Sequence, residues 1–234
     1  LKLAGAVFTN ITHDHLDYHG TFDAYIKAKK KLFDELPKDA FALVNGDDKR
    51  GGVMVQNCRG TLQTFGLKSA ADFKAKILSN TIEGLELEVN GKLIWFRMIG
   101  SFNAYNLLGV LGTAVLLGED EYEVLRELSA IKGAKGRFDR ISIGGITAIV
   151  DYAHTPDAVT KVLKTLTDVR HKRVIGVLGC GGNRDSSKRP IMGRALFDGC
   201  DVAIFTSDNP RNEKPEAILA EMVQGLALDH NHHV

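Results

Sequence analysis

The sequence predicts an α/β fold in which a mostly parallel sheet carries helices on both faces. Short apolar runs of strand length alternate with longer segments of helical spacing along the whole chain. Most of these strand-like runs end in polar or glycine-rich turns, and ligands of such sheets bind beyond the carboxyl ends of the strands. A Gly/Lys-rich stretch at residues 132–137 changes the composition and predicts two domains, 1–134 and 135–234.

The individual elements follow from apolar spacing and from cap and turn residues. Thr21 is a suitable N-cap for a helix that Pro37 ends, and Asn90-Gly91 between two apolar runs predicts a hairpin. The expected strands cover 6–10, 41–44, 61–66, parts of 77–98, 141–143, 147–150, 174–178 and 202–205. The expected helices cover 21–36, 102–117, 121–131, a segment opened by Pro156, 191–197 and 215–228.

The composition argues against several classes of protein. Of the 234 residues, 30 are basic and 29 acidic, so the chain lacks the strong basic charge of a nucleic-acid or membrane surface. Its apolar runs are far shorter than the ~20 residues that span a membrane. The three cysteines are an odd count without paired spacing, and we interpret them as reduced thiols. We therefore expect a monomeric cytoplasmic protein with no nucleic-acid or membrane partner.

A cluster of possible metal ligands follows the first strand. His13, His15, Asp17 and His19 alternate along the chain, close to the HxHxDH pattern of metallo-β-lactamase-like hydrolases. Tyr18 shifts the match by one residue. From these residues alone, a metal-dependent hydrolase that binds Zn²⁺ stays an open alternative.

Lys29 lies at helical spacing within the apolar stripe of the next segment, which includes Phe22, Ile26 and Phe33. One interpretation is a snorkelling lysine, whose stem is covered while its ammonium group reaches water. The other is that desolvation lowers the pKa of the amine. A neutral amine can add carbon dioxide, and the resulting carbamate is an anionic oxygen ligand of the kind that Mg²⁺ prefers.

Further polar residues stand at the starts of helices and the ends of strands. Asn103 and Asn106 lie three apart at a helix start, where two amides could cap the helix or read the edge of adenine. Arg137 lies in the expected linker, and Asp151 follows a buried strand. Asp151 could cap the next helix or accept hydrogen bonds from a ribose.

Two glycine- or proline-containing turns end the last expected strands. Residues 179–185 (Gly-Cys-Gly-Gly-Asn-Arg-Asp) fail the GxGxxG pattern, because Arg184 stands where the third glycine belongs. Small residues here would still allow close approach of a ligand to the backbone. Residues 207–211 read Ser-Asp-Asn-Pro-Arg, which by itself is a turn.

The run at residues 9–20, Thr-Asn-Ile-Thr-His-Asp-His-Leu-Asp-Tyr-His-Gly, followed by Tyr25-Ile26-Lys27-Ala28-Lys29, resembles the central domain of the Mur ligases. The resemblance implies that His15 binds Mg²⁺ and that Lys29 is carbamylated and serves the same metal region. It implies a central ATP-binding α/β domain followed by a Rossmann-like C-terminal α/β domain.

The same resemblance assigns nucleotide contacts. The Phe-Asn-x-x-Asn element at Asn103 and Asn106 implies adenine recognition, with the second Asn in contact. It places Arg137 on the ATP phosphates, Asp151 on the ribose and His154 near the phosphates. Lys29 and Arg137 are thus the catalytic candidates.

The Asp-Asn-Pro-Arg run resembles the Mur ligases that add meso-diaminopimelate, and it implies that Arg184, Asn209 and Arg211 contact this amino acid. The implied reaction joins it to the D-glutamate γ-carboxylate of a UDP-linked muramoyl dipeptide, through an acyl phosphate. There is no initiator Met, and the family's N-terminal domain, its phosphate-binding loop and the end of its C-terminal domain have no counterpart in the sequence. We therefore expect a fragment that does not turn over by itself.

Overall fold

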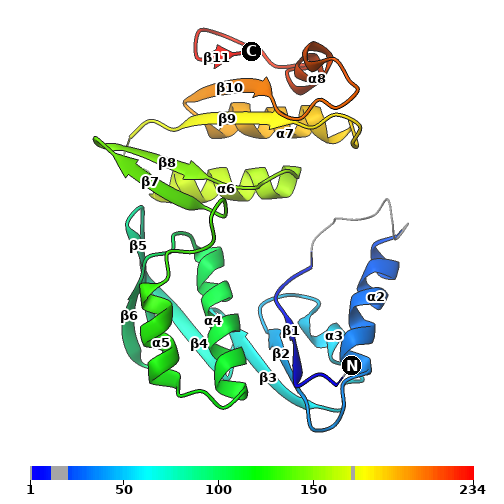
Figure 1. Cartoon of the computed structure of the whole chain (residues 1–234), viewed down its shortest axis with the longest axis vertical. Coiled ribbons are helices and arrows are strands. Elements are labelled where there is room, and N and C mark those ends of the chain that lie inside the picture. Colours follow the sequence, from blue (N-terminus) through cyan, green and yellow to red (C-terminus); the bar gives the residue numbers. More distant parts are fainter. Residues whose placement is uncertain (1, 12–20, 170–171) are drawn as a thin grey trace. The chain divides into compact units, whose positions relative to one another are not determined.

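The computed structural model describes residues 2–11, 21–169 and 172–234 (Figure 1). The chain divides into two compact units, Leu1–Lys132 and Gly133–Val234. No helix among the described residues combines the length and the apolar character needed to cross a membrane.

The first unit is built on one six-stranded sheet with the order β1-β2-β3-β4-β5-β6. Its strands are β1 (Gly5–Phe8), β2 (Phe41–Asn45), β3 (Thr61–Gly66), β4 (Phe73–Thr81), β5 (Gly84–Val89) and β6 (Lys92–Phe96). The pairs from β1 to β4 are parallel, whereas β4, β5 and β6 pair antiparallel. The predicted hairpin at Asn90-Gly91 is confirmed, because both residues have a positive φ, of 48° and 80°, as a tight hairpin turn requires.

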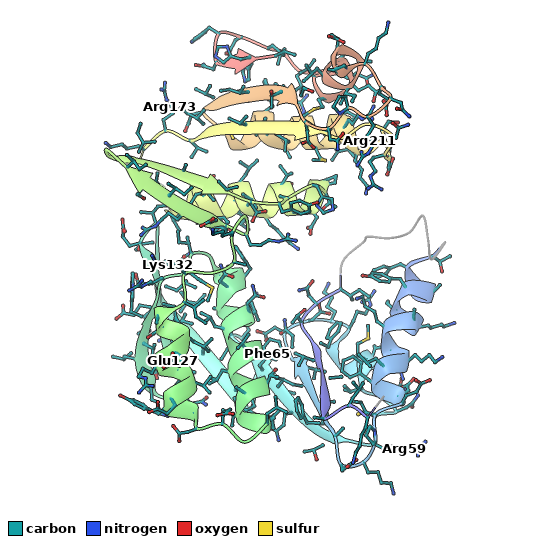
Figure 2. The ribbon with its side chains drawn as sticks, in the orientation of Figure 1. Arg59, Phe65, Glu127, Lys132, Arg173 and Arg211 are labelled. Atoms are coloured by element: carbon teal, nitrogen blue, oxygen red, sulfur yellow. The ribbon has the colours of Figure 1, made fainter. Side chains whose placement is uncertain are left out.

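Helices cover both faces of this sheet, as predicted. They are α2 (Phe22–Asp34), the short α3 (Gly51–Met54), α4 (Ser101–Leu116) and α5 (Glu121–Ala130). Alternate residues of the fully buried strand β2 belong to different cores: Leu43 to the one that includes residues of α4 and α5, Val44 to the one that includes residues of α2 and α3. Phe65 of β3 joins the first core, and its ring comes close to Gly109 of α4 (Figure 2). Thr21 caps α2 as predicted, since its side chain accepts a hydrogen bond from the Ala24 N–H at 3.2 Å.

The second unit contains an antiparallel hairpin and a parallel three-stranded sheet. The hairpin joins β7 (Asp139–Ile143) to β8 (Ile146–Val150), and the sheet has the order β11-β10-β9, with β9 (Ile175–Cys180), β10 (Val202–Ser207) and β11 (His232–His233). Its helices are α6 (Pro156–Val169), α7 (Lys188–Gly199) and α8 (Pro215–Met222). Their apolar faces form one core with the sheet.

Three features of the chain differ from the sequence prediction. Helix α8 was expected to reach residue 228 but ends at Met222, because Gly225 takes a left-handed conformation with φ of 72° that stops a helix. The short helix α3 was not predicted. Residues 232–233 form a strand beside β10 that was not predicted either.

Candidate functional site

The end of β1 is tied to the turn that follows β2. The Asn45 side-chain amide donates to the Thr9 carbonyl at 2.9 Å, and the Asp48 carboxylate accepts from the Ile11 N–H at 3.4 Å. Because β1 and β2 are parallel neighbours, their carboxyl ends share one edge of the sheet. The predicted metal ligand His15 follows this anchor in the sequence, as do His13, Asp17 and His19 of the hydrolase alternative. Residues 12–20 lie outside the described part of the chain.

Lys29 is not desolvated in the structure. The residue is exposed, and its Nζ lies 5.1 Å from the centroid of the Tyr25 ring, where a cation–π contact supports it. Of the two interpretations of Lys29, the exposed side chain fits the snorkelling lysine and not the buried amine. Leu32 of the same helix is 46% exposed, whereas the neighbouring Lys30 side chain is only 13% exposed and pairs with Asp34.

The two amides at the start of α4 have different roles. Asn103 is buried; its Nδ2 donates to the Ile99 carbonyl at 2.8 Å and its Oδ1 accepts from Asn106 Nδ2 at 3.0 Å. The N-cap of the helix is Gly100, which makes no side-chain capping bond, so the capping interpretation of the two amides is not supported. Asn103 thus orients Asn106, and the exposed Asn106 is the amide that a base could reach.

Asp47 anchors the same helix from the turn after β2, a role that the sequence did not predict. Its Oδ2 accepts from the N–H groups of Leu67 and Lys68 and from the Tyr105 hydroxyl, at 2.7, 2.9 and 2.9 Å, and its Oδ1 accepts from the Ser69 N–H at 2.8 Å. Burial raises the pKa of Asp47, but hydrogen bonds from Ser69 and from the Lys68 and Leu67 backbone outweigh burial and hold it well below its usual value.

Tyr105 directly precedes Asn106 in α4. The Asp47 carboxylate therefore connects the turn after β2, the loop after β3 and the helix turn that carries Asn106, the amide that could contact a base. Burial and the bond to Asp47 raise the pKa of Tyr105 to about 12, so its hydroxyl remains a donor at neutral pH. The only sequence signal for this arrangement was a carboxylate in the turn after a buried parallel strand.

In the second unit, two of the predicted nucleotide residues lie beside one aromatic ring. The Arg137 guanidinium carbon lies 5.0 Å from the Tyr152 ring centroid, and the His154 ring meets that ring edge-on at 5.3 Å. The carboxylate of Asp151 accepts from the Phe138 N–H at 2.8 Å, which fixes the residue after Arg137. The arrangement brings two basic groups and one carboxylate to the start of this unit, and Arg137 and His154 are exposed there.

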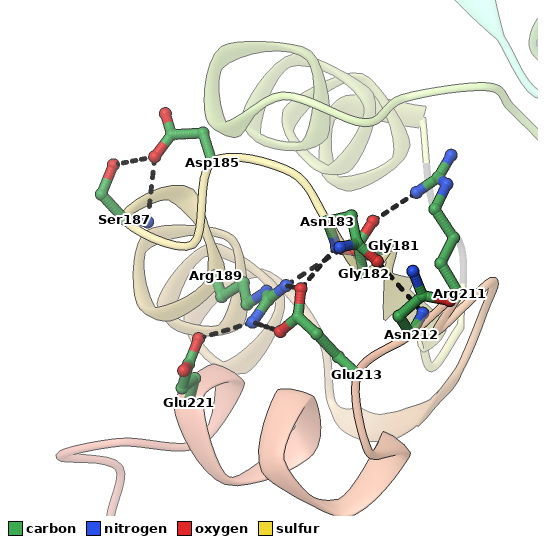
Figure 3. A network of polar contacts seen from close by, with 10 residues as sticks. All are labelled: Gly181, Gly182, Asn183, Asp185, Ser187, Arg189, Arg211, Asn212, Glu213 and Glu221. Atoms are coloured by element: carbon green, nitrogen blue, oxygen red, sulfur yellow. Dashed lines mark hydrogen bonds and ion pairs between the residues drawn. The ribbon is translucent and has the colours of Figure 1, made fainter.

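The predicted amino-acid residues lie on two loops that bind each other. Gly182 donates its N–H to the Asn209 carbonyl at 2.8 Å, and the Arg211 guanidinium donates back to the Gly182 carbonyl. A Cβ on Gly182 would lie 1.9 Å from the Pro210 carbonyl oxygen, so only glycine permits this approach. These loops follow the parallel strands β9 and β10 at their carboxyl ends (Figure 3), and Arg184, Asn209 and Arg211 are all exposed there.

Both units match models of one family. The model of the Mur ligase middle domain matches residues 1–114, and the model of the Mur ligase glutamate ligase domain matches residues 136–234. The chain belongs to the Mur ligase family. It is 58% identical over 230 residues to the UDP-N-acetylmuramoyl-L-alanyl-D-glutamate–2,6-diaminopimelate ligase of Cytophaga hutchinsonii, with 97% of this chain and 47% of the relative aligned.

Other Mur ligases are similar to this chain in sequence or in fold. The ligase of the same name from Bacteroides thetaiotaomicron is 52% identical over 97% of this chain and 48% of its own length, so the chain spans about half the length of these relatives. A solved structure with that name covers 100% of this chain and 50% of its own, at 35% identity and a TM-score of 0.66. MurF from Acinetobacter baumannii has a TM-score of 0.75 over 94% of this chain and 49% of its own, and at 18% identity it shows the shared fold alone.

The hydrolase alternative gains no support. Within residues 2–11, 21–169 and 172–234, no group of three or more His, Cys, Asp or Glu side chains is arranged to hold a metal ion. The cluster that would serve a hydrolase lies in 12–20, outside these ranges, while the family match assigns the same residues to a Mur ligase.

Proposed function

We propose that this protein acts as an ATP-dependent amide ligase in the cytoplasm, as a monomer. Its reaction adds meso-2,6-diaminopimelate to the D-glutamate γ-carboxylate of UDP-N-acetylmuramoyl-L-Ala-D-Glu, a step of peptidoglycan precursor synthesis. The observation that carries this proposal is the pair of interlocked loops after β9 and β10, which holds the guanidinium of Arg211 beside Gly182. The high identity to ligases of this name supports it.

The chemistry begins with phosphoryl transfer. An oxygen of the D-glutamyl γ-carboxylate attacks the γ-phosphorus of ATP, and ADP leaves. The amine of diaminopimelate then attacks the acyl carbon and phosphate leaves, giving the amide and one proton. Positioning and charge neutralisation provide most of the catalysis in such reactions.

Each unit contributes its own part of the nucleotide contacts. In the first unit, Asn106, held by Asn103, reads the adenine edge. In the second, Asp151 binds the ribose, and Arg137 and His154 neutralise phosphate charge. The Tyr152 ring beside Arg137 limits the rotamers of that guanidinium, which reduces the entropy lost on binding a phosphate.

Arg211 distinguishes diaminopimelate from lysine in this proposal. One of its terminal nitrogens donates to Gly182, and the remaining guanidinium donors are directed to the second carboxylate of the substrate, which lysine lacks. Arg184 supplies a second positive charge, and Asn209 contacts the amino acid from the other loop.

The metal region is proposed on the sequence resemblance. His15 and carbamylated Lys29 would together serve Mg²⁺, which neutralises phosphate charge when bound. Lys29 is exposed, so carbon dioxide can reach its amine. Mass spectrometry of the intact protein should show the added mass of carbon dioxide on Lys29, lost in acid, and a bare Lys29 would contradict this part.

The function is tested with the protein expressed from its complete reading frame. ADP release is measured with ATP, Mg²⁺ and the UDP-linked dipeptide, with either meso-diaminopimelate or L-lysine added. The proposal predicts ADP release that depends on the dipeptide and on diaminopimelate and is much slower with lysine. Equal rates with both amino acids would reject the assigned specificity, and Zn²⁺-dependent hydrolysis without ATP would favour the hydrolase.

A further inference from the structure

We propose that the ion network of the buried Arg189 with Glu213 and Glu221 is a positioning device for the amino-acid site, acting through Glu213 on the two interlocked loops. None of these three residues is among the predicted contacts of any substrate. The inference rests on the proposed function for the identity of the substrate, but the positioning itself rests on the contacts below.

The centre of the network is Arg189 on α7, which is only 2% exposed. Its Nη1 donates to Glu213 Oε2 and to Glu221 Oε2, both at 2.8 Å, and its Nη2 donates to Glu213 Oε1 at 2.9 Å (Figure 3). The two bonds to Glu213 form a bidentate pair, which fixes the carboxylate in direction as well as distance. Nη2 also donates to the Gly181 carbonyl at 3.2 Å, so the same guanidinium contacts the glycine loop directly.

Glu213 connects Arg189 to both loops, because it belongs to the loop after β10 and is hydrogen-bonded to the loop after β9. It accepts a hydrogen bond from the Asn183 N–H, and the Asn183 side chain accepts one from the Asn212 N–H at 3.1 Å. Glu213 itself lies two residues after Arg211 in the second loop. Glu221, by contrast, belongs to α8 and accepts a single bond from Arg189, so of the two carboxylates on Arg189 only Glu213 is also bonded to the loop backbone.

The loops are held in conformations that need such support. Asn183 has a φ of 52° and Arg211 a φ of 50°, in the left-handed region that most residues other than glycine disfavour, although asparagine tolerates it better than arginine does. Both residues are in the loops that carry the predicted substrate contacts. Hydrogen bonds at Asn183 and around Arg211 therefore oppose relaxation of the backbone to a more common conformation.

Charge gives the network a second effect. A free carboxylate next to Arg211 would repel an anionic amino acid, and the bidentate contact with Arg189 neutralises Glu213. The hydrogen bond from Arg189, followed by that from the Asn183 N–H, lowers the pKa of Glu213 to about 2, so this carboxylate stays ionised as an acceptor.

Stability alone does not explain the network. Burying an ion pair often contributes little or no net stability compared with apolar residues of the same size. The Nε of Arg189 is buried with no hydrogen-bond partner among the described residues, which adds a desolvation penalty. A role in fixing the loops accounts for a buried charge of this kind.

The test compares Glu213→Gln with Glu221→Gln in the protein expressed from its complete reading frame. Both variants remove one charge from Arg189, but only the first disturbs a residue bonded to Asn183. We expect Glu213→Gln to raise the KM for diaminopimelate about tenfold or more, with less than about twofold change in the KM for ATP. Glu221→Gln, which weakens the network without touching the loop backbone, should raise the KM for diaminopimelate clearly less than Glu213→Gln does. The exposed Glu216→Gln, outside the network, should leave both constants near the wild type.

Hydrogen–deuterium exchange on the same proteins gives a readout that needs no activity. Peptides covering 181–184 and 209–213 should exchange faster in Glu213→Gln than in Glu221→Gln. Equal exchange in the two variants, or an equal rise in the KM for ATP and for diaminopimelate, would overturn the positioning role. A wild-type protein without diaminopimelate-dependent ADP release would reject the proposed function instead, and the exchange comparison would still decide the positioning.

Discussion

Replacing Asp47 by asparagine should destabilise the first unit by about 3 kcal/mol. The carboxylate accepts four hydrogen bonds, from three backbone N–H groups and the Tyr105 hydroxyl. Asparagine keeps one oxygen and turns the other into a donor, so at least one N–H group, such as that of Ser69, would face a donor. Losing one charge-assisted hydrogen bond costs roughly 1.5–3 kcal/mol, and weakening the other three adds to this loss. Because the side chain is only partly buried, solvent reduces the total to the value given above.

The assay uses the only tryptophan of the chain, Trp95, which lies in β6 and reports on the first unit alone. For a unit of this size the predicted loss lowers the fluorescence melting temperature by roughly 10 °C. The matched control is Asp72→Asn, whose exposed carboxylate accepts hydrogen bonds from Thr64. If Asp47→Asn and Asp72→Asn melt at the same temperature, the anchoring role of Asp47 is wrong.

The remaining predictions concern packing, binding and pH. Gly193→Ala should lower the free energy of unfolding of the second unit, measured in urea, by about 3 kcal/mol, because its Cβ would lie 1.8 Å from the Met222 carbonyl oxygen. Gly52→Ala in α3 of the first unit, where a Cβ meets open space, should leave the stability of its own unit near the wild type. Asn106→Ala should raise the KM for ATP about tenfold without lowering the melting temperature, and a nucleotide affinity that does not change would contradict adenine recognition. The pKa of Glu213 is lowered to about 2 from 4.5, so its contribution to stability is present above about pH 4.5 and is lost as the pH falls toward 2. The free energy of unfolding of Glu213→Gln should therefore fall less steeply than that of the wild type between pH 4.5 and 2. The same pH dependence in both proteins would show that Glu213 is not part of the ion network.

Local signals in the sequence predicted most of the elements. Thr21 and Asn90-Gly91 act through neighbours a few residues away, so their roles can be read from the sequence and are confirmed in the structure. The end of α8 was missed because Gly225 was read as an interior residue of an apolar helix, whereas its left-handed backbone stops the helix. Its spacing from Phe22, Ile26 and Phe33 placed Lys29 on the inward face of the helix. Spacing alone does not say how far a long side chain extends from that face into solvent.

The parts of the site that the sequence did not predict depend on distant partners. Asp47 meets Tyr105 across 58 positions, and Arg189 meets Glu221 across 32. A charged residue in such a contact looks like an ordinary surface residue in the sequence, because neither spacing nor composition records the partner. The predicted contacts at Asn209 and Arg211 could be named in advance only because the run Asp-Asn-Pro-Arg resembles a motif of the Mur ligases, since by itself this run indicates a turn.

Steady-state kinetics of Arg211→Ala show whether Arg211 recognises the second carboxylate of diaminopimelate. We expect the variant to have a KM for diaminopimelate about tenfold to a hundredfold higher, a KM for ATP that changes little, and a reduced preference for diaminopimelate over L-lysine. Equal increases in the two KM values, or an unchanged preference for diaminopimelate over lysine, would contradict it.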